Sequence, residues 1–319
     1  MAALQLGRLT FRASLEHDVM TVAQGTAYAA MVSLFPGLIV AAAVIALLPD
    51  TFPVQMQLAV FFDRILPSNV SPVLQAYFQT SHKNPQTAGA LVSAVIVSVT
   101  GAAGVMATLM EGFRRAHELP IIPGSFWQRR GRALALVPLS LIPMALASAL
   151  VVFGHLISTW LANYVSTAVR TPVYLLAFVL RWGIALAGSV GILAVIYHLG
   201  TDVSQHLREH LAPWIREPWL ALRKEWTWRR SLPGAMFATV LWFISTLLFG
   251  WYVTRFANYS RVYGSLGAAI ALMFWLYIIA LSVLIGSEFN AQIAMERKNA
   301  EVNEAALWNP SPPADTPDR

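Results

Sequence analysis

The sequence contains no cysteine, which excludes disulfide bonds, thiolate metal sites and cysteine nucleophiles. Charge is also scarce, because Asp, Glu, Lys and Arg make up 12% of the 319 residues, about half of the roughly 25% that soluble domains contain. A glycine-rich phosphate loop and a G-x-S-x-G elbow are both absent from the sequence. We therefore expect no separate water-soluble domain, no cofactor and no enzymatic activity.

Long apolar runs are the main feature that the sequence does contain. Hydrophobic residues make up 57% of the chain, and residues 262–287 run for 26 positions without a charge. A run of roughly 20 apolar residues is enough to cross the hydrocarbon core of a bilayer as a helix. The sequence therefore predicts an all-α integral membrane protein with six transmembrane helices, at about 28–48, 88–110, 133–153, 173–199, 235–253 and 265–287.

The basic residues are unevenly distributed between the two predicted sides of the membrane. Sixteen of the 22 Lys and Arg residues lie near the chain ends and in the connections 111–132 and 200–234, whereas five lie in the other connections. By the positive-inside rule, the amino and carboxyl termini are both predicted to be cytoplasmic. Basic clusters such as Arg129 to Arg132 are predicted to lie at the membrane boundary, where anionic headgroups attract them, and we expect no nucleic-acid partner.

The two ends of the chain differ from the predicted transmembrane domain, residues 27–292. Residues 1–26 lack the pattern of a cleaved signal peptide, because Glu-His-Asp at positions 16–18 interrupts them, and they are predicted to form a cytoplasmic interfacial arm. Residues 293–319 are polar and rich in proline toward their end, so they are predicted to be a disordered cytoplasmic tail.

Arg181 has the highest expected free-energy cost of membrane insertion in the sequence, because it lies inside the fourth predicted span. An arginine at the middle of a membrane costs about 2.5 to 3.5 kcal/mol on insertion scales. One interpretation is that Arg181 faces a water-filled cavity and meets an anionic solute or lipid headgroup. The other is that it extends toward the outer interface or binds backbone carbonyls of a broken helix.

A second group of polar residues falls at the predicted cytoplasmic ends of the even-numbered spans. It is either an inner gate or a set of ordinary helix-end residues bonded to loop backbone. Arg114 and Arg115 could pair with either carboxylate of this group. The predicted cytoplasmic polar layer consists of Glu111, Arg114, His198, Glu288 and Asn290.

The first span supplies further candidates for a substrate path. Pro36 interrupts the hydrogen bonding of this helix, and such interruptions often line the path of a transporter. Close packing of a helix bundle uses the same residue types, so the signal is weak by itself. Together with Arg181, the candidates for the path are Tyr28, Ser33 and Pro36.

One pattern typical of metal enzymes occurs in the second basic loop. His206 to His210 match H-x-x-E-H, which places two imidazoles one helical turn apart, as zinc ligands require. A third ligand is not evident nearby, and five-residue patterns arise by chance. We therefore expect a solvated loop helix and no metal site.

Several stretches of the chain resemble the YihY/BrkB family of membrane proteins, once labelled ribonuclease BN. The most specific match begins at Tyr263, Gly264, Ser265 and Gly267 and continues to Gln292. The other matching stretches are Ala27 to Pro36, Leu109 to Ala116, Leu180 to Trp182 and Ser231 to Ala235. The resemblance implies six membrane helices in the bacterial inner membrane, in a family without an agreed biochemical activity.

These features favour a transporter or exporter of a polar or anionic solute or lipid. In this hypothesis Arg181 meets the negative charge, and the layer of Glu111 and Glu288 forms the inner gate. The expected partners are membrane lipids and an unknown polar or anionic solute, and the sequence does not determine the oligomeric state. Two other classes compete with it: a non-transporting scaffold or envelope-assembly protein and, less favoured, an RNA-processing or metal-dependent hydrolase.

Overall fold

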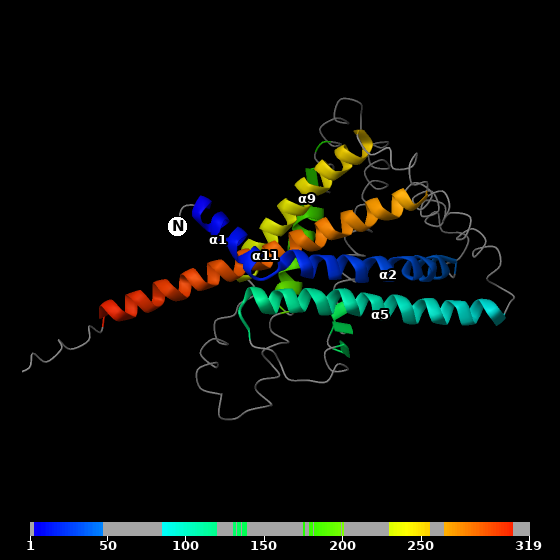
Figure 1. Cartoon of the computed structure of the whole chain (residues 1–319), viewed down its shortest axis with the longest axis horizontal. Coiled ribbons are helices and arrows are strands. Elements are labelled where there is room, and N and C mark those ends of the chain that lie inside the picture. The colour runs from blue at the N-terminus through cyan, green and yellow to red at the C-terminus, as the bar shows by residue number, and fades with distance from the viewer. Residues whose placement is uncertain are drawn as a thin grey trace, which may run out of the picture.

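The computed structural model describes several separate parts of the chain, all of them helical apart from short turns. These parts are residues 3–46, 85–119, 130–131, 133–134, 136–138, 175, 179–180, 182–198, 200, 230–255 and 265–308. Their main helices are α1 (Ala3–Glu16), α2 (Val19–Ala46), α5 (Pro85–Ala116), α9 (Leu232–Arg255) and α11 (Ser265–Trp308) (Figure 1). The described ranges contain no strand, in agreement with the predicted all-α class.

Four helices of the described residues are long and apolar enough to cross a membrane. These stretches are Val19–Val40, Leu91–Ala116, Leu232–Arg255 and Ala269–Glu301. They correspond to the first, second, fifth and sixth predicted spans. A shorter apolar helix, Trp182–His198, covers part of the fourth. Most of the predicted third span lies outside the described residues, so the count of six and the orientation of the termini stay predictions.

The helices α2 and α5 form one antiparallel pair and lie side by side along most of their length (Figure 1). Small residues allow this close approach. A Cβ added to Gly101 would lie 2.5 Å from the Cβ of Ser33. About two turns further along the pair, Thr26 donates a hydrogen bond of 2.9 Å to the hydroxyl of Thr108. This bond satisfies two polar side chains at the interface of two apolar helices.

The helices α9 and α11 form the second antiparallel pair, and here the two backbones touch. A Cβ on Gly286 would lie 2.7 Å from the carbonyl oxygen of Gly234 and 2.6 Å from the Cβ of Ala238. The hydroxyl of Tyr197, from the short apolar helix, donates a hydrogen bond of 2.6 Å to the carbonyl of Val283. Because these contacts involve the two backbones, only glycine fits at positions 234 and 286.

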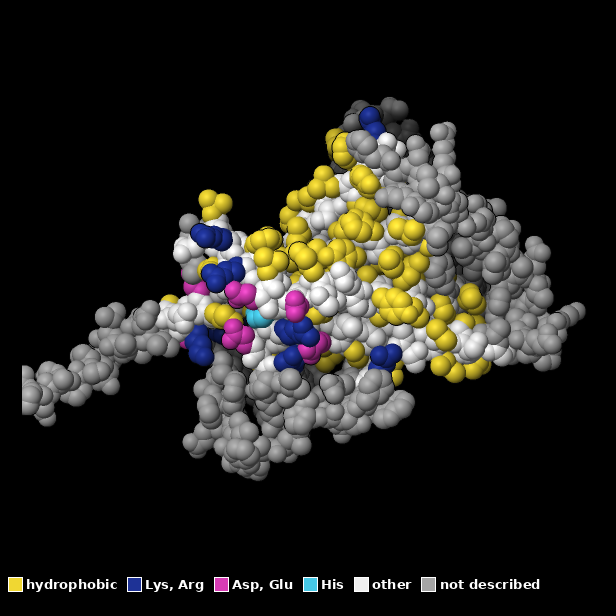
Figure 2. Space-filling model, in the orientation of Figure 1, with side chains coloured by type: hydrophobic (Ala, Val, Ile, Leu, Met, Phe, Trp, Pro, Cys, Tyr) yellow, Lys and Arg dark blue, Asp and Glu magenta, His cyan; other side chains and the backbone are white. Residues whose placement is uncertain are grey.

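The buried core lies near one end of the bundle, where all these helices meet. Phe113 of α5 is fully buried and packs edge-on against the ring of Tyr197, with the ring centroids 5.2 Å apart. Leu284 of α11 belongs to the same cluster. Large apolar side chains cover the sides of the described bundle, whereas charged ones gather at the end where α1 lies (Figure 2). This pattern is typical of a bundle whose sides face lipid.

Two helices extend beyond the predicted boundaries. The first spanning helix begins at Val19 instead of near residue 28, because residues 19–27 contain no charge or proline and the only break is the turn at His17 and Asp18. The last helix continues to Trp308, so the tail is not disordered over residues 293–308. That stretch is polar, but it is rich in the strong helix formers Ala, Glu, Met, Lys and Arg and contains no Gly or Pro.

Candidate functional site

The most unusual polar contact in the described structure joins the start of the chain to its last helix. The Nδ1 atom of His17 lies 2.9 Å from Oε1 of Glu288, although the two residues are 271 positions apart. The carboxylate of Glu288 is completely buried, whereas the imidazole is 21% exposed. Within the part of the chain that the structure describes, the second oxygen, Oε2, has no hydrogen-bond partner. A buried carboxylate needs such a partner because its desolvation is costly.

The turn between α1 and α2 positions the imidazole. Asp18 adopts a φ of 54°, a left-handed conformation that ends α1 and lets α2 start in a new direction. The amide of His17 still donates to the carbonyl of Ala13, and the amide of Val22 donates to that of Asp18. Because α1 also packs against α11 through its buried face, His17 is held over Glu288.

Sequence reasoning missed His17 as a member of this site. The signal was present, because Glu16, His17 and Asp18 form a cluster of titratable residues directly before the first long apolar run. Its partner could not be identified, because a pair so distant in sequence is defined only by the packing of α1 on α11. Glu288, by contrast, is among the predicted polar residues.

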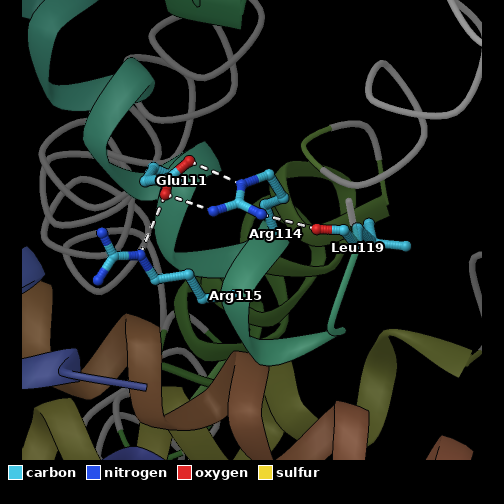
Figure 3. A network of polar contacts seen from close by, with 4 residues as sticks. All are labelled: Glu111, Arg114, Arg115 and Leu119. Carbon is cyan, nitrogen blue, oxygen red and sulfur yellow. Dashed lines mark hydrogen bonds and ion pairs between the residues drawn. The ribbon is translucent and has the colours of Figure 1, made fainter. Parts of the chain in front are cut away.

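Glu111 forms a separate network at the end of α5 (Figure 3). Arg114 donates from Nε to Oε2 at 2.8 Å and from Nη2 to Oε1 at 2.6 Å, while Arg115 donates from Nε to Oε1 at 3.0 Å. The two arginines therefore pair with Glu111 and leave Glu288 to His17. Because the carboxylate of Glu111 is 40% exposed, solvent screens much of this attraction.

We expect Glu111→Gln to lower the free energy of unfolding by only about 0 to 1 kcal/mol, because exposed ion pairs within one helix contribute little. Thermal unfolding of the purified protein in detergent measures the effect. The exposed pair of Arg12 and Glu16 on α1 gives the matched control, and Glu16→Gln should behave in the same way. A loss of folding on Glu111→Gln would contradict this assignment.

Arg114 also contacts the turn that follows α5. Nη1 of Arg114 donates to the carbonyl of Leu119 at 2.7 Å, and Glu118 turns the chain with a φ of 49°. The imidazole of His117 lies with Nδ1 3.0 Å from the carbonyl of Phe113, and burial holds the pKa of His117 below its usual value. The backbone amides of residues 117–119 pair with the last carbonyls of α5, which a helix end would otherwise leave without partners.

Asn290 joins α11 to the start of α9. Its Oδ1 accepts a hydrogen bond of 2.7 Å from the amide of Gly234, and its Nδ2 donates to the carbonyl of Ser231 at 3.1 Å. The first amides of a helix have no partner within the helix, so the side chain of Asn290 caps α9 from a neighbouring helix. The predicted polar layer was interpreted either as an inner gate or as helix-end residues bonded to backbone. Asn290 fits the second interpretation.

The other predicted residues lie in different places. Tyr28 is 68% exposed on the outside of α2, and Ser33 packs against Gly101 and donates to the carbonyl of Ala30 at 3.0 Å. His198 is the last residue of the short apolar helix. Pro36 lies inside α2, Ser265 begins α11, and Gly267 is buried. Arg181, Tyr263 and Gly264 lie outside the described residues.

A membrane-protein family model matches nearly the whole chain. The model is described as virulence factor BrkB and covers residues 10–213 and 219–309. The ribonuclease-like protein YfkH of Bacillus subtilis is 27% identical over 292 residues, which are 90% of this chain and 94% of YfkH. A UPF0761 membrane protein of Alteromonas mediterranea is 26% identical over 297 residues, 90% of this chain and 87% of that protein. No solved structure matches the chain.

Proposed function

We propose that this chain, which belongs to the virulence factor BrkB family of membrane proteins, is a transporter or exporter of a polar or anionic solute or lipid. Its proposed place is the bacterial inner membrane, with both termini in the cytoplasm. The positive-inside count and the membrane-protein names of its relatives support this placement. The proposal assigns no catalytic activity to the chain.

The observation that carries the proposal is the buried carboxylate of Glu288. This residue lies within the candidate span Ala269–Glu301 and is completely buried. Ionisable groups inside membrane helices are expensive, and they commonly mark ion or substrate pathways. Two well-packed apolar residues would stabilise the bundle at least as well as a buried pair of ionisable side chains. We therefore infer that His17 and Glu288 serve a function beyond stability.

The position of the two partners favours a gate. His17 belongs to the turn after α1, an amphipathic helix that exposes Leu4, Phe11 and Leu15 on one face. Such a helix is suited to lie in the interface, where it can shift without crossing the membrane. Because the pair is a polar contact between this turn and α11, breaking it would weaken the attachment of α1 to the end of the bundle, which then rests on the packing of its buried face. This end is the predicted cytoplasmic mouth of the path.

The test is transport in proteoliposomes with two anionic probes. One probe is fluorescent phosphatidylglycerol, whose transbilayer movement is followed by dithionite quenching, and the other is radiolabelled inorganic phosphate. Wild-type protein should move at least one probe faster than protein-free liposomes. Glu288→Gln, which keeps the shape and removes the charge, should slow that movement by roughly tenfold. Glu16→Gln, at an exposed position of α1, should not.

The proposal is contradicted if the wild-type protein moves neither probe faster than empty liposomes. Equal rates for the wild type and Glu288→Gln would leave transport standing but remove the gate from the His17 and Glu288 pair. Thermal unfolding of each variant is measured in parallel, so that a loss of rate is not confused with a loss of folding.

A scaffold or envelope-assembly protein is the second candidate, and one observation favours it. The helix α11 extends well past the bundle toward Trp308 (Figure 1), and its residues from Arg297 to Glu301 are exposed. A projecting polar helix offers a surface for a cytoplasmic partner. A scaffold would keep its place in the membrane but would move neither probe.

The hydrolase class rests on the name of one relative, the ribonuclease-like protein of Bacillus subtilis. No group of three or more metal-ligating side chains occurs in the described ranges, and His206 and His210 lie outside them. No described contact favours a hydrolase over the other two classes.

A further inference from the structure

We propose that Glu288 is a proton-binding site, whose carboxyl group exchanges one proton with water through the imidazole of His17. The proton is thus the ligand that controls the gate formed by these two residues. Its control of the gate rests on the proposed function, but proton binding itself can be measured without transport. Three observations support the site: the burial of Glu288, its oxygen without a partner and the position of His17.

The contacts of Glu288 suit a carboxyl group that takes up a proton. Its side chain has no exposed surface, and Nδ1 of His17 lies 2.9 Å from Oε1. Oε2 has no hydrogen-bond partner within the described chain. An ionised carboxylate accepts hydrogen bonds at both oxygens, so an unpaired oxygen on a buried charge is costly. A protonated carboxyl donates from one oxygen and leaves only a neutral carbonyl oxygen unpaired, which costs less.

His17 lies between Glu288 and water. Glu288 is the first charged side chain after the uncharged run 262–287, and charged side chains gather at this end of the described bundle (Figure 2). The imidazole of His17 is 21% exposed, whereas the carboxyl of Glu288 has no contact with solvent. A proton from water therefore reaches Glu288 through the imidazole.

The exchange uses the two ring nitrogens of His17 and one carboxyl oxygen. In the ionised state, Nδ1–H of the neutral imidazole donates to Oε1. Water protonates Nε2, which gives an imidazolium. The N–H bond at Nδ1 then breaks, its electron pair stays on Nδ1, and the proton forms an O–H bond with Oε1. The imidazole is again neutral, with its proton on Nε2, and Glu288 is a neutral acid. The reverse steps release the proton.

Release of the proton gives the gate a reason to open. The unloaded site holds a neutral imidazole and a buried carboxylate, so it carries one uncompensated negative charge. Hydration of Glu288 would relieve this cost, and hydration requires that His17 and the turn after α1 move away from α11. The loaded site is neutral and favours the closed arrangement. We therefore expect the gate to close when the proton binds.

Two neighbouring groups act electrostatically on Glu288, and they have opposite effects. His17 is the hydrogen-bond partner, and Glu118, which follows α5, is an exposed acid whose negative charge disfavours a second charge at Glu288. Glu16 and Asp18 flank His17 in sequence and are both exposed. Glu118 therefore offers a way to change the proton affinity of Glu288 without altering the buried pair.

The other titratable groups of the helices packed at this end have different partners. Arg114 and Arg115 of α5 pair with Glu111, and Nδ1 of His117 lies 3.0 Å from the carbonyl of Phe113. The hydroxyl of Tyr197 donates to the carbonyl of Val283, while His198 and Arg230 also make contacts of their own. The helix α2 faces α11 with apolar residues that include Val19 and Val22.

Infrared spectroscopy of the purified full-length protein in an ester-free maltoside detergent tests proton binding. A protonated carboxyl has a carbonyl stretching band that an ionised carboxylate lacks. As the pH is raised, the wild type should lose a band that Glu288→Gln lacks at every pH. Glu288→Asp keeps the acid and should move the band to a different frequency. This variant also serves if Glu288→Gln fails to fold.

His17→Asn tests the relay. Asparagine keeps a hydrogen-bonding side chain beside Oε1 but cannot carry a proton between water and Glu288. The band should therefore persist in this variant. Its shift on transfer into deuterated water should be slower than in the wild type by roughly 100-fold, because proton transfer through a positioned side chain is lost.

Glu118→Gln tests the assignment of the band to a group near the end of α5. Because this variant removes a negative charge that acts on Glu288, the wild-type band should disappear at a lower pH. Glu301→Gln is the matched control, since Glu301 is exposed and lies 13 residues further along α11. This separation is roughly 20 Å along the helix, well beyond the Debye length of about 8 Å, so the pH dependence should not change.

A pH-dependent band that is identical in the wild type, Glu288→Gln and Glu288→Asp overturns the proton site. Deuterium exchange in His17→Asn as fast as in the wild type overturns the relay through His17. Equal shifts for Glu118→Gln and Glu301→Gln contradict the assignment of the band to Glu288. Failure of transport in proteoliposomes would leave the band in place, and loss of the band would leave the measured transport rates in place, so the two proposals fail separately.

Discussion

Replacing Gly286 by alanine is expected to prevent the native packing of α9 on α11 and to lower the free energy of unfolding by more than about 3 kcal/mol. A Cβ at this position would lie 2.5 Å from the hydroxyl oxygen of Tyr197, 2.6 Å from the Cβ of Ala238 and 2.7 Å from the carbonyl oxygen of Gly234. Real Cβ atoms essentially never come this close to another heavy atom. Because a backbone carbonyl is among the three, a rotamer change cannot relieve the overlap.

Thermal unfolding in detergent, followed by circular dichroism, measures the change. Gly250→Ala on α9 is the control, because no heavy atom lies within 4 Å of the added Cβ. Alanine has a higher helix propensity than glycine, so this control should be neutral or slightly stabilising. Gly234→Ala should resemble Gly286→Ala, since its Cβ would overlap the carbonyl of Gly286 and the side chain of Asn290. A stable Gly286→Ala variant would show that α9 and α11 do not touch here.

Replacing His17 by alanine is expected to cost about 3 to 5 kcal/mol of stability, because it leaves a buried carboxylate without its partner. The pair joins Nδ1 of His17 to Oε1 of Glu288, and the carboxylate has no exposed surface through which water could replace the imidazole. Removing one partner of a buried pair is much more harmful than removing both.

A double-mutant cycle isolates this interaction. His17→Ala combined with Glu288→Gln should recover part of the lost stability, because the buried group is then neutral. Glu16→Ala, at the neighbouring exposed residue, should cause no measurable change in unfolding. If the effects of His17→Ala and Glu288→Gln simply add, the two side chains do not interact in the folded protein, and the proposed gate loses its physical basis.

Much of the fold could be predicted from the sequence. The helices α2, α5, α9 and α11 overlap four of the six predicted spans, because the length of an apolar run can be read from the local sequence and decides whether a helix can cross a bilayer. The family relationship was also readable, from short matches along most of the chain. The prediction was wrong at the carboxyl end, where polarity was taken for disorder although helix propensity is high.

The candidate site was less predictable, although several of its residues were identified. Glu111, Glu288 and Asn290 were expected near one another, and the structure gives each a different role. Glu111 binds arginines of its own helix, and Asn290 caps α9. The role of Glu288 depends on His17, which no local pattern connects with it.

By itself, the sequence determined where the apolar helices are and where charge accumulates, because the cost of exposing polar groups to lipid acts on each segment separately. The tertiary structure alone decided which polar groups meet. The pairing of His17 with Glu288 depends on how helices distant in sequence pack. So does the hydrogen bond from Arg130 to the carbonyl of Thr100. Packing at the glycine contacts, here Gly234 and Gly286, sets the spacing of α9 and α11 and with it the position of Glu288.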